Sequence, residues 1–128
     1  MAVASWVAGF DVLYALPDAE FDRAQGLRSI PAALGVPNAI WVARALHLLT
    51  VAAFTLVGLA LPAAGAVAGA WWWAGVSLAS AILLYEHSLV TSEDLSKLDA
   101  AFFTMNGVLS ILFFGCVLAG RVLSGGTR

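Results

Sequence analysis

The acidic residues near the start of the chain are the clearest candidates for chemistry. Asp11, Asp18 and Asp22 are separated by seven and four residues, and Tyr14 falls between the first two. On an α-helix these offsets return to nearly the same side, so one face would carry three carboxylates and a phenol. Pro17 lies inside this stretch and is expected to kink the helix.

Such a face could bind a divalent cation. Carboxylates without matched cations repel one another, and Mg²⁺ binds one or two of them together with water and substrate phosphates. Arg23 and Arg28 follow closely in the sequence and could hold phosphate oxygens. The alternative is a solvated helix end with ordinary surface charges. The spacing alone leaves both interpretations open.

The elements that must position these residues are apolar. The 128 residues are 62% hydrophobic and 11% charged, with a mean hydropathy of +0.93, whereas soluble domains carry about 25% charged residues. This composition excludes a water-soluble domain, a disordered chain and a nucleic-acid-binding protein, and it indicates a polytopic membrane protein. A single cysteine, Cys116, rules out an internal disulfide.

Four apolar stretches predict about four transmembrane helices, over residues 1–16, 39–61, 66–85 and 100–120. They do not alternate with period two, so helices are favoured over a barrel. The predicted fold class is all-α, a transmembrane helix bundle in one domain over 1–128. Basic residues flank the first and third connections and place them in the cytoplasm. The tryptophans at 71–73 then form an aromatic belt at the other interface, or stack on a substrate.

Three segments resemble the UbiA family of intramembrane aromatic prenyltransferases. They read GFDVLYALPDAEFDRAQGLRSIPAALG at 9–35, LLYEHSLV at 83–90 and AFFTMNG at 101–107. They look closest to the 4-hydroxybenzoate polyprenyltransferase branch and to the related menaquinone branch. The resemblance covers essentially the whole chain.

The resemblance implies a fold of about nine transmembrane helices. Two aspartate-rich motifs then face each other across a cavity near the cytoplasmic side, where they bind Mg²⁺ and a polyprenyl diphosphate. Asp18 and Asp22 match the second motif and Asp11 its upstream acid, so these three are the expected catalytic and metal-binding residues. The expected substrate-binding residues are Arg28 near the diphosphate, Arg23, Tyr14, Asn106, Glu86 and His87.

The first aspartate-rich motif of the family has no counterpart in this sequence. We therefore expect the chain to correspond to the C-terminal half of the fold, with its entry helix cut short. A longer parent protein or a second polypeptide would supply the N-terminal half. This chain alone would then hold only half of the metal and diphosphate site.

The implied function is Mg²⁺-dependent transfer of a polyprenyl group from its diphosphate to an aromatic acid such as 4-hydroxybenzoate. This reaction of ubiquinone or menaquinone biosynthesis would run through a carbocation. The lipid bilayer of a bacterial inner membrane would hold the chain, with the aspartates on the cytoplasmic side. Two alternatives stay open: a relative with another acceptor, such as a menaquinone precursor, haem, chlorin or sugar phosphate, and a small non-enzymatic membrane protein that dimerises.

Four other polar residues have two interpretations each. His47 is an interfacial histidine or contacts a substrate carboxylate. Glu86 and His87 form a helix end in water or line the pocket of the aromatic substrate. Asn106 bonds another helix through its amide or belongs to the site.

Overall fold

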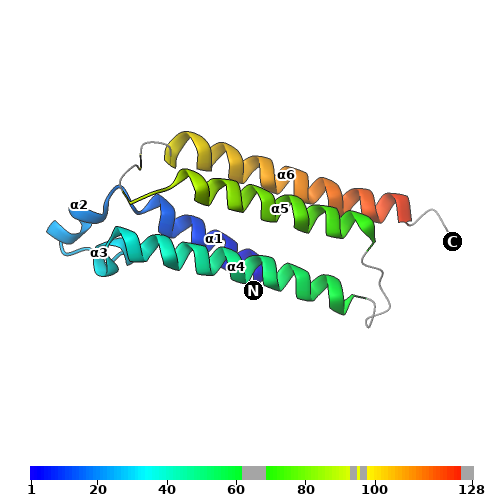
Figure 1. Ribbon diagram of the computed structural model, residues 1–128, viewed down its shortest axis with the longest axis horizontal. Helices are drawn as coiled ribbons and strands as arrows, with labels where there is room; N and C mark the ends of the chain where they lie inside the picture. The colour runs from blue at the N-terminus through cyan, green and yellow to red at the C-terminus, as the bar shows by residue number, and fades with distance from the viewer. Residues whose placement is uncertain (62–68, 93–94, 96–97, 125–128) are drawn as a thin grey trace.

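The computed structural model describes residues 1–61, 69–92, 95 and 98–124, and every regular element in these ranges is a helix. The helices are α1 (Ala2–Tyr14), α2 (Ala19–Ala24), α3 (Ile30–Leu34), α4 (Val36–Ala60), α5 (Ala70–Leu89) and α6 (Leu98–Ser124). Four longer helices run along one axis, and the short α2 and α3 lie together at one end (Figure 1). The all-α prediction is confirmed, and α2 and α3 are two short helices that the sequence did not predict.

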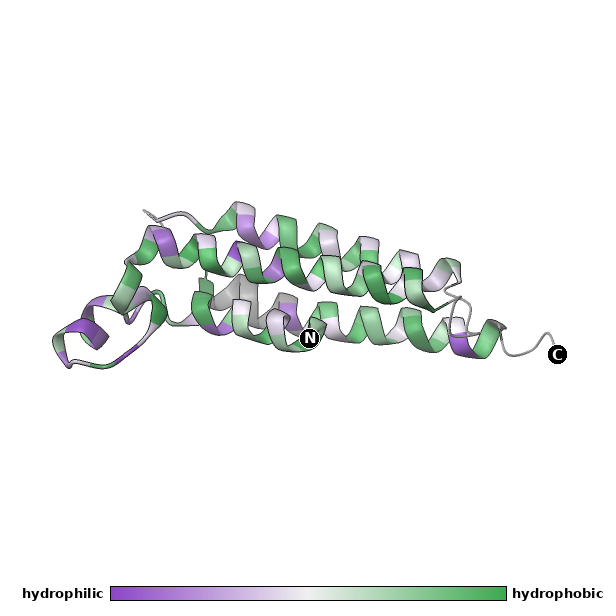
Figure 2. Cartoon of the chain, turned by 90° about the horizontal axis from the view of Figure 1, so that it is seen from below, coloured by the Kyte–Doolittle hydropathy of each residue, from purple (hydrophilic) through white to green (hydrophobic). Residues whose placement is uncertain are grey.

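Two described helices are long and apolar enough to cross a membrane by length and composition: Val36–Ala60, which is α4, and Asn106–Leu123 within α6. The long helices are mostly hydrophobic along their length, while polar residues gather around α2 and α3 (Figure 2). These features indicate an integral membrane protein. The stretches at 1–16 and 66–85 were also predicted to span, but the helices α1 and α5 that correspond to them are not among the two. The connection at 62–65, between the second and third predicted spans, lies outside the described residues.

The bundle is built from two helix pairs, α1 with α4 and α5 with α6. Ala39 and Ala43 of α4 are completely buried. Their small side chains let α1 and α4 approach closely. Gly9 of α1 lies against His47 of α4, and a Cβ atom there would overlap the imidazole ring. The buried core draws side chains from α1, α4, α5 and α6: Phe10, Val12, Leu13, Ala39, Ile40, Ala43, Ala79, Leu83 and Leu109.

The first helix is not continuous through Pro17, so the prediction of one kinked helix is wrong. Proline lacks an N–H group and cannot extend the helical ladder. The helix α1 ends at Tyr14, and the amide of Leu16 then donates to the carbonyl of Leu13 over 3.1 Å. Leu13 and Leu16 are each 1% exposed, so they hold this turn against the core. The chain therefore changes direction before Asp18 instead of bending gently.

Candidate functional site

Asp18 and Asp22 lie on a single turn at the polar end of the bundle. Asp18 is the N-cap residue of α2, and the backbone amide of Asp22 donates to its carbonyl over 2.8 Å. Ala19, between them, is 3% exposed and fixes the turn to the core. The Asp18 side chain is exposed and that of Asp22 is partly buried. Asp22 thus follows Asp18 by one helical turn, and residues four apart share a side of a helix; that the two carboxylates lie together stays a prediction from this spacing.

Asp11 and Tyr14 form a separate group on α1. Both are exposed, whereas Val12 and Leu13 between them are buried in the core. Because α1 ends at Tyr14, α2 does not continue this stripe. The predicted single face of three carboxylates and a phenol is therefore wrong, and the break at Pro17 divides it into two groups.

The donor set of α2 suits a metal ion that keeps most of its water. Within the described ranges, no three His, Cys, Asp or Glu side chains gather as a ready set of metal ligands. Mg²⁺ needs only one or two protein carboxylates when substrate phosphates and water complete its octahedron. Asp18 and Asp22 can supply two such carboxylates from one turn, so the residues present fit Mg²⁺ held jointly with a diphosphate.

Two arginines follow these acids in the sequence, Arg23 in the last turn of α2 and Arg28 in the loop after it. Gly26 has a φ of 69°, a left-handed conformation that glycine adopts without strain, and the amide of Leu27 donates to the carbonyl of Asp22 over 2.8 Å. Arg23 donates from Nε to the carbonyl of Ala32 over 3.1 Å, so it also braces α3. Arg28 is exposed. Of the two predicted phosphate-binding residues, Arg28 has its whole guanidinium available and Arg23 only part.

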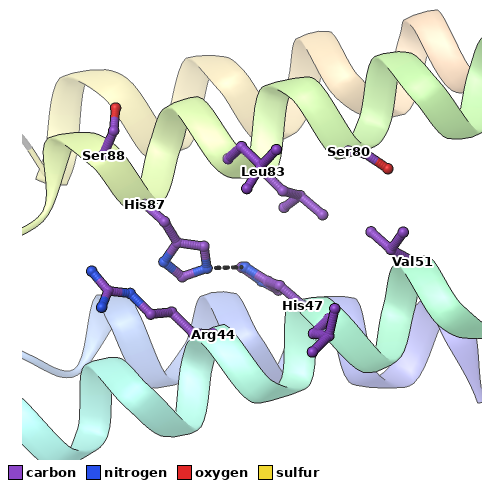
Figure 3. Close-up of a pocket in the computed structure, with 9 residues that line it drawn as sticks. Arg44, His47, Val51, Ser80, Leu83, His87 and Ser88 are labelled. Carbon is purple, nitrogen blue, oxygen red and sulfur yellow. Dashed lines mark hydrogen bonds between the residues drawn. The ribbon is translucent and has the colours of Figure 1, made fainter.

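A pair of histidines lies deeper in the bundle, between α4 and α5. Nδ1 of His47 and Nε2 of His87 are 2.9 Å apart (Figure 3), and Nε2 of His47 is 3.3 Å from the carbonyl oxygen of Trp6. His47 is 2% exposed, and its ring contacts that of Phe10 with 4.7 Å between centroids. His47 is therefore a core residue and not the interfacial histidine considered from the sequence.

The Trp6 carbonyl orders the protons along this chain of rings. A carbonyl can only accept, so Nε2 of His47 carries the proton, and in a neutral ring Nδ1 is then the acceptor. Nε2 of His87 must donate to it, which leaves Nδ1 of His87 as an acceptor. That atom is buried and has no hydrogen-bond partner among the described residues. The sequence carries no local sign of this pair, because its members are 40 residues apart.

Glu86 and Asn106 occupy different environments. Glu86 is 0% exposed, and neither carboxyl oxygen has a hydrogen-bond partner within the described part of the chain. The idea that it ends a helix in water is wrong. A buried carboxyl without a partner is costly, so this group calls for a ligand or a further side chain. Asn106 is partly exposed on α6, where its backbone carbonyl accepts the hydroxyl of Ser110 over 2.8 Å.

The tryptophans at 71–73 are not a uniform belt. Trp71 is 43% exposed. Trp72 instead packs inside the bundle against Phe54 of α4 and Phe113 of α6, with ring centroids 6.3 and 5.8 Å apart. The interfacial role predicted for the indoles therefore suits Trp71, while Trp72 joins the two helix pairs.

Comparison with known proteins identifies relatives over nearly the whole chain. The sequence profile of the UbiA prenyltransferase family matches residues 1–119. A 4-hydroxybenzoate octaprenyltransferase of Aromatoleum aromaticum is 27% identical over 113 residues, which are 88% of this chain and 36% of that protein. The protein of the same name from Edwardsiella ictaluri is 31% identical over 114 residues, 89% of this chain and 38% of that protein. The chain thus spans a little over a third of the curated relatives it matches, and no solved structure matches it.

Proposed function

Since the chain belongs to the UbiA prenyltransferase family, we propose that it carries the second aspartate-rich half of a polyprenyl transfer site. The donor is a polyprenyl diphosphate, and the acceptor is an aromatic acid of the 4-hydroxybenzoate type, in ubiquinone or menaquinone biosynthesis. The names of the two similar proteins support this substrate class. The other half of the site comes from an N-terminal part of the fold, which belongs either to a longer parent protein or to a second polypeptide.

The observation that carries the proposal is the pair of carboxylates on α2. Asp18 and Asp22 protrude from the polar end of an otherwise apolar bundle, on a turn anchored by Leu16 and Ala19. Neither side chain has a protein partner among the described residues, so both can accept a ligand. Acids that only solubilise a helix end would need no such anchoring.

Each residue has a role that follows from its position. Asp18 and Asp22 hold Mg²⁺, which when bound neutralises charge on the diphosphate leaving group. Arg28 binds diphosphate oxygens through its free guanidinium, and Arg23 adds its remaining N–H groups. Asp11 and Tyr14, exposed on α1, are the acid and the phenol that the family resemblance adds to this site. Glu86 and Asn106 contact the acceptor or the polyprenyl chain, while the ring of His87 pairs with that of His47.

The chemistry suits a site closed off by apolar helices. The C–O bond between the allylic carbon and the diphosphate breaks, and the diphosphate leaves with the electron pair. A ring carbon of the acceptor then gives a π-electron pair to the allylic cation, and loss of the ring proton restores aromaticity. The cation would react with water, so the apolar helices protect it by excluding water. The membrane setting therefore serves the reaction.

The direct test is prenyl transfer in membranes that contain the protein at its native length. Membranes are incubated with a polyprenyl diphosphate, 4-hydroxybenzoate and Mg²⁺, and the prenylated acid is measured by mass spectrometry. Asp22→Asn should abolish the product while leaving the amount of membrane-inserted protein unchanged. Glu20→Gln is the matched control, because Glu20 is an exposed acid on the same helix outside the proposed ligand set.

Two results would contradict the proposal. Near wild-type transfer by the Asp22→Asn protein would remove the metal-binding role of α2. Transfer only to a naphthoate, chlorin or haem precursor would keep the family chemistry and replace the acceptor. An immunoblot of the source membranes supplies the native length, and a band at 13.3 kDa would require a partner polypeptide in the assay.

A further inference from the structure

A groove between α4 and α5 lies apart from the acidic turn. It has a volume of about 460 Å³, and its walls are mostly the aliphatic side chains of Leu48, Val51, Leu83 and Leu84. In the close-up, α1 and α6 lie behind the α4–α5 pair, so the groove opens on the face that neither covers (Figure 3). In the part of the chain that the structure describes, no further helix lies over this face.

Arg44 lies where this groove meets a second, smaller hollow. That hollow has a volume of about 220 Å³ and includes Trp41, Thr91 and Ser92 in its lining, with Arg44 common to both. The guanidinium lies 4.9 Å from the centre of the Trp41 ring, and it makes no ion pair with any described residue. Trp41 is 65% exposed. A cation stacked on an exposed indole at the polar end of a membrane helix is suited to an anionic headgroup.

His87 adds a second, independent sign of a ligand. The proton order set by Trp6 and His47 leaves Nδ1 of His87 as a buried acceptor with no partner among the described residues. In the close-up this atom is on the side of the ring that faces Arg44 (Figure 3). The groove therefore offers a positive charge and a hydrogen-bond acceptor side by side, above an aliphatic channel. A ligand that matches it has an anion, a hydroxyl donor and a long apolar tail.

We propose that this groove binds a phospholipid whose headgroup carries a phosphate and free hydroxyls, as in phosphatidylglycerol. The phosphate contacts Arg44, a headgroup hydroxyl donates to Nδ1 of His87, and one acyl chain lies along Leu48, Val51 and Leu84. Leu48 and Leu84 are 70% and 73% exposed, so the channel wall is accessible. This lipid site is separate from the acidic turn and does not depend on the proposed transfer reaction.

The test is lipid binding by the full chain in detergent, followed by native mass spectrometry. Phosphatidylglycerol and phosphatidylcholine with the same acyl chains are titrated in parallel, and we expect phosphatidylglycerol to bind more tightly. Arg44→Gln should weaken phosphatidylglycerol binding about fivefold, the effect of one basic residue near a membrane surface. Arg44→Lys should retain most of it. Arg121→Gln, a change at an exposed arginine near the end of α6, should leave binding unchanged.

A second variant tests the channel for the acyl chain. It keeps the proposal testable if the Arg44→Gln protein does not fold. Ser80 lines the groove and bonds only to its own helix, so Ser80→Phe fills the channel and should reduce binding of both lipids. Circular dichroism and thermal melting confirm that each variant is folded. Wild-type lipid binding by folded Arg44→Gln and Ser80→Phe proteins would overturn the proposal. Full displacement of the lipid by inorganic phosphate would also overturn it, since the site would then bind only an anion.

Discussion

The acidic turn and the buried histidine pair are both polar, but they are held in opposite ways. Asp18 and Asp22 lie on the turn that opens a short helix, and among the described residues their carboxylates form no hydrogen bond or ion pair. His47 and His87 are enclosed between α4 and α5 and bond to each other and to the Trp6 carbonyl. The first region is open to a ligand, and the second is largely satisfied by the protein.

This difference predicts whether a substitution should reduce activity or stability. Groups that await a ligand contribute little to the folded state, so their loss should cost activity alone. Hydrogen-bond partners offset the cost of burying polar groups inside an apolar bundle. Removing one such group should therefore reduce stability first. The region around Gly9, Ser5 and Thr50, where α1 meets α4, belongs to the second kind. Four experiments test this division.

The largest effect is expected from Asp18→Asn at the acidic turn. Prenyl transfer by the native-length protein should fall on the order of 10²-fold or more, as when a preorganised electrostatic group is lost from a reaction centre. The melting temperature should stay unchanged, because the Asp18 side chain is exposed. Activity and thermal melting are measured on the same preparation. A clear loss of stability would show that Asp18 also has a structural role.

Gly9→Ala should have the next largest effect, on stability. The added methyl group would overlap the buried His47 ring, and overpacking a core costs about 1–3 kcal/mol. The free energy of unfolding is measured by denaturant titration in detergent. Gly107→Ala is the matched control, because a Cβ at Gly107 meets no atom within 4 Å. Equal stability of the two variants would mean that α1 and α4 are not packed as described.

Thr50→Val should have a smaller effect at the same helix contact. Oγ1 of Thr50 lies 2.9 Å from the hydroxyl of Ser5, which joins α4 to α1. Loss of this bond should cost about 0.6–1 kcal/mol of unfolding free energy. Ser80→Ala removes a hydroxyl that bonds only to the Val76 carbonyl of its own helix, over 2.8 Å. If Thr50→Val and Ser80→Ala lower the free energy of unfolding equally, the contact between Thr50 and Ser5 is refuted.

The smallest effect is expected from the two arginines of the acidic turn. Arg23→Gln removes the exposed bond to the Ala32 carbonyl and should lower stability by about 0.5 kcal/mol. Arg28→Gln should leave stability unchanged and raise the KM for the polyprenyl diphosphate. Thermal melting and substrate titration separate the two roles. An unchanged KM in the Arg28→Gln protein would remove Arg28 from the diphosphate site.

Composition and local spacing were enough to predict several features of this protein. Its apolar stretches predicted the all-α fold and located α4 and α6 to within a few residues. The segments around Asp18, Glu86 and Asn106 carried the family resemblance, which the profile match over residues 1–119 confirmed. The placement of Asp18 and Asp22 one helical turn apart was also predictable from their spacing.

The features that depend on packing between helices could be found only in the three-dimensional arrangement. Pro17 could kink a helix or end it, and burial of Leu13, Leu16 and Ala19 in the core decided for an end. His47 and His87 meet because α4 and α5 pack side by side, and a separation of 40 residues leaves no periodic sign. A spacing rule holds along one helix, whereas a contact between helices depends on every side chain that sets their distance and rotation.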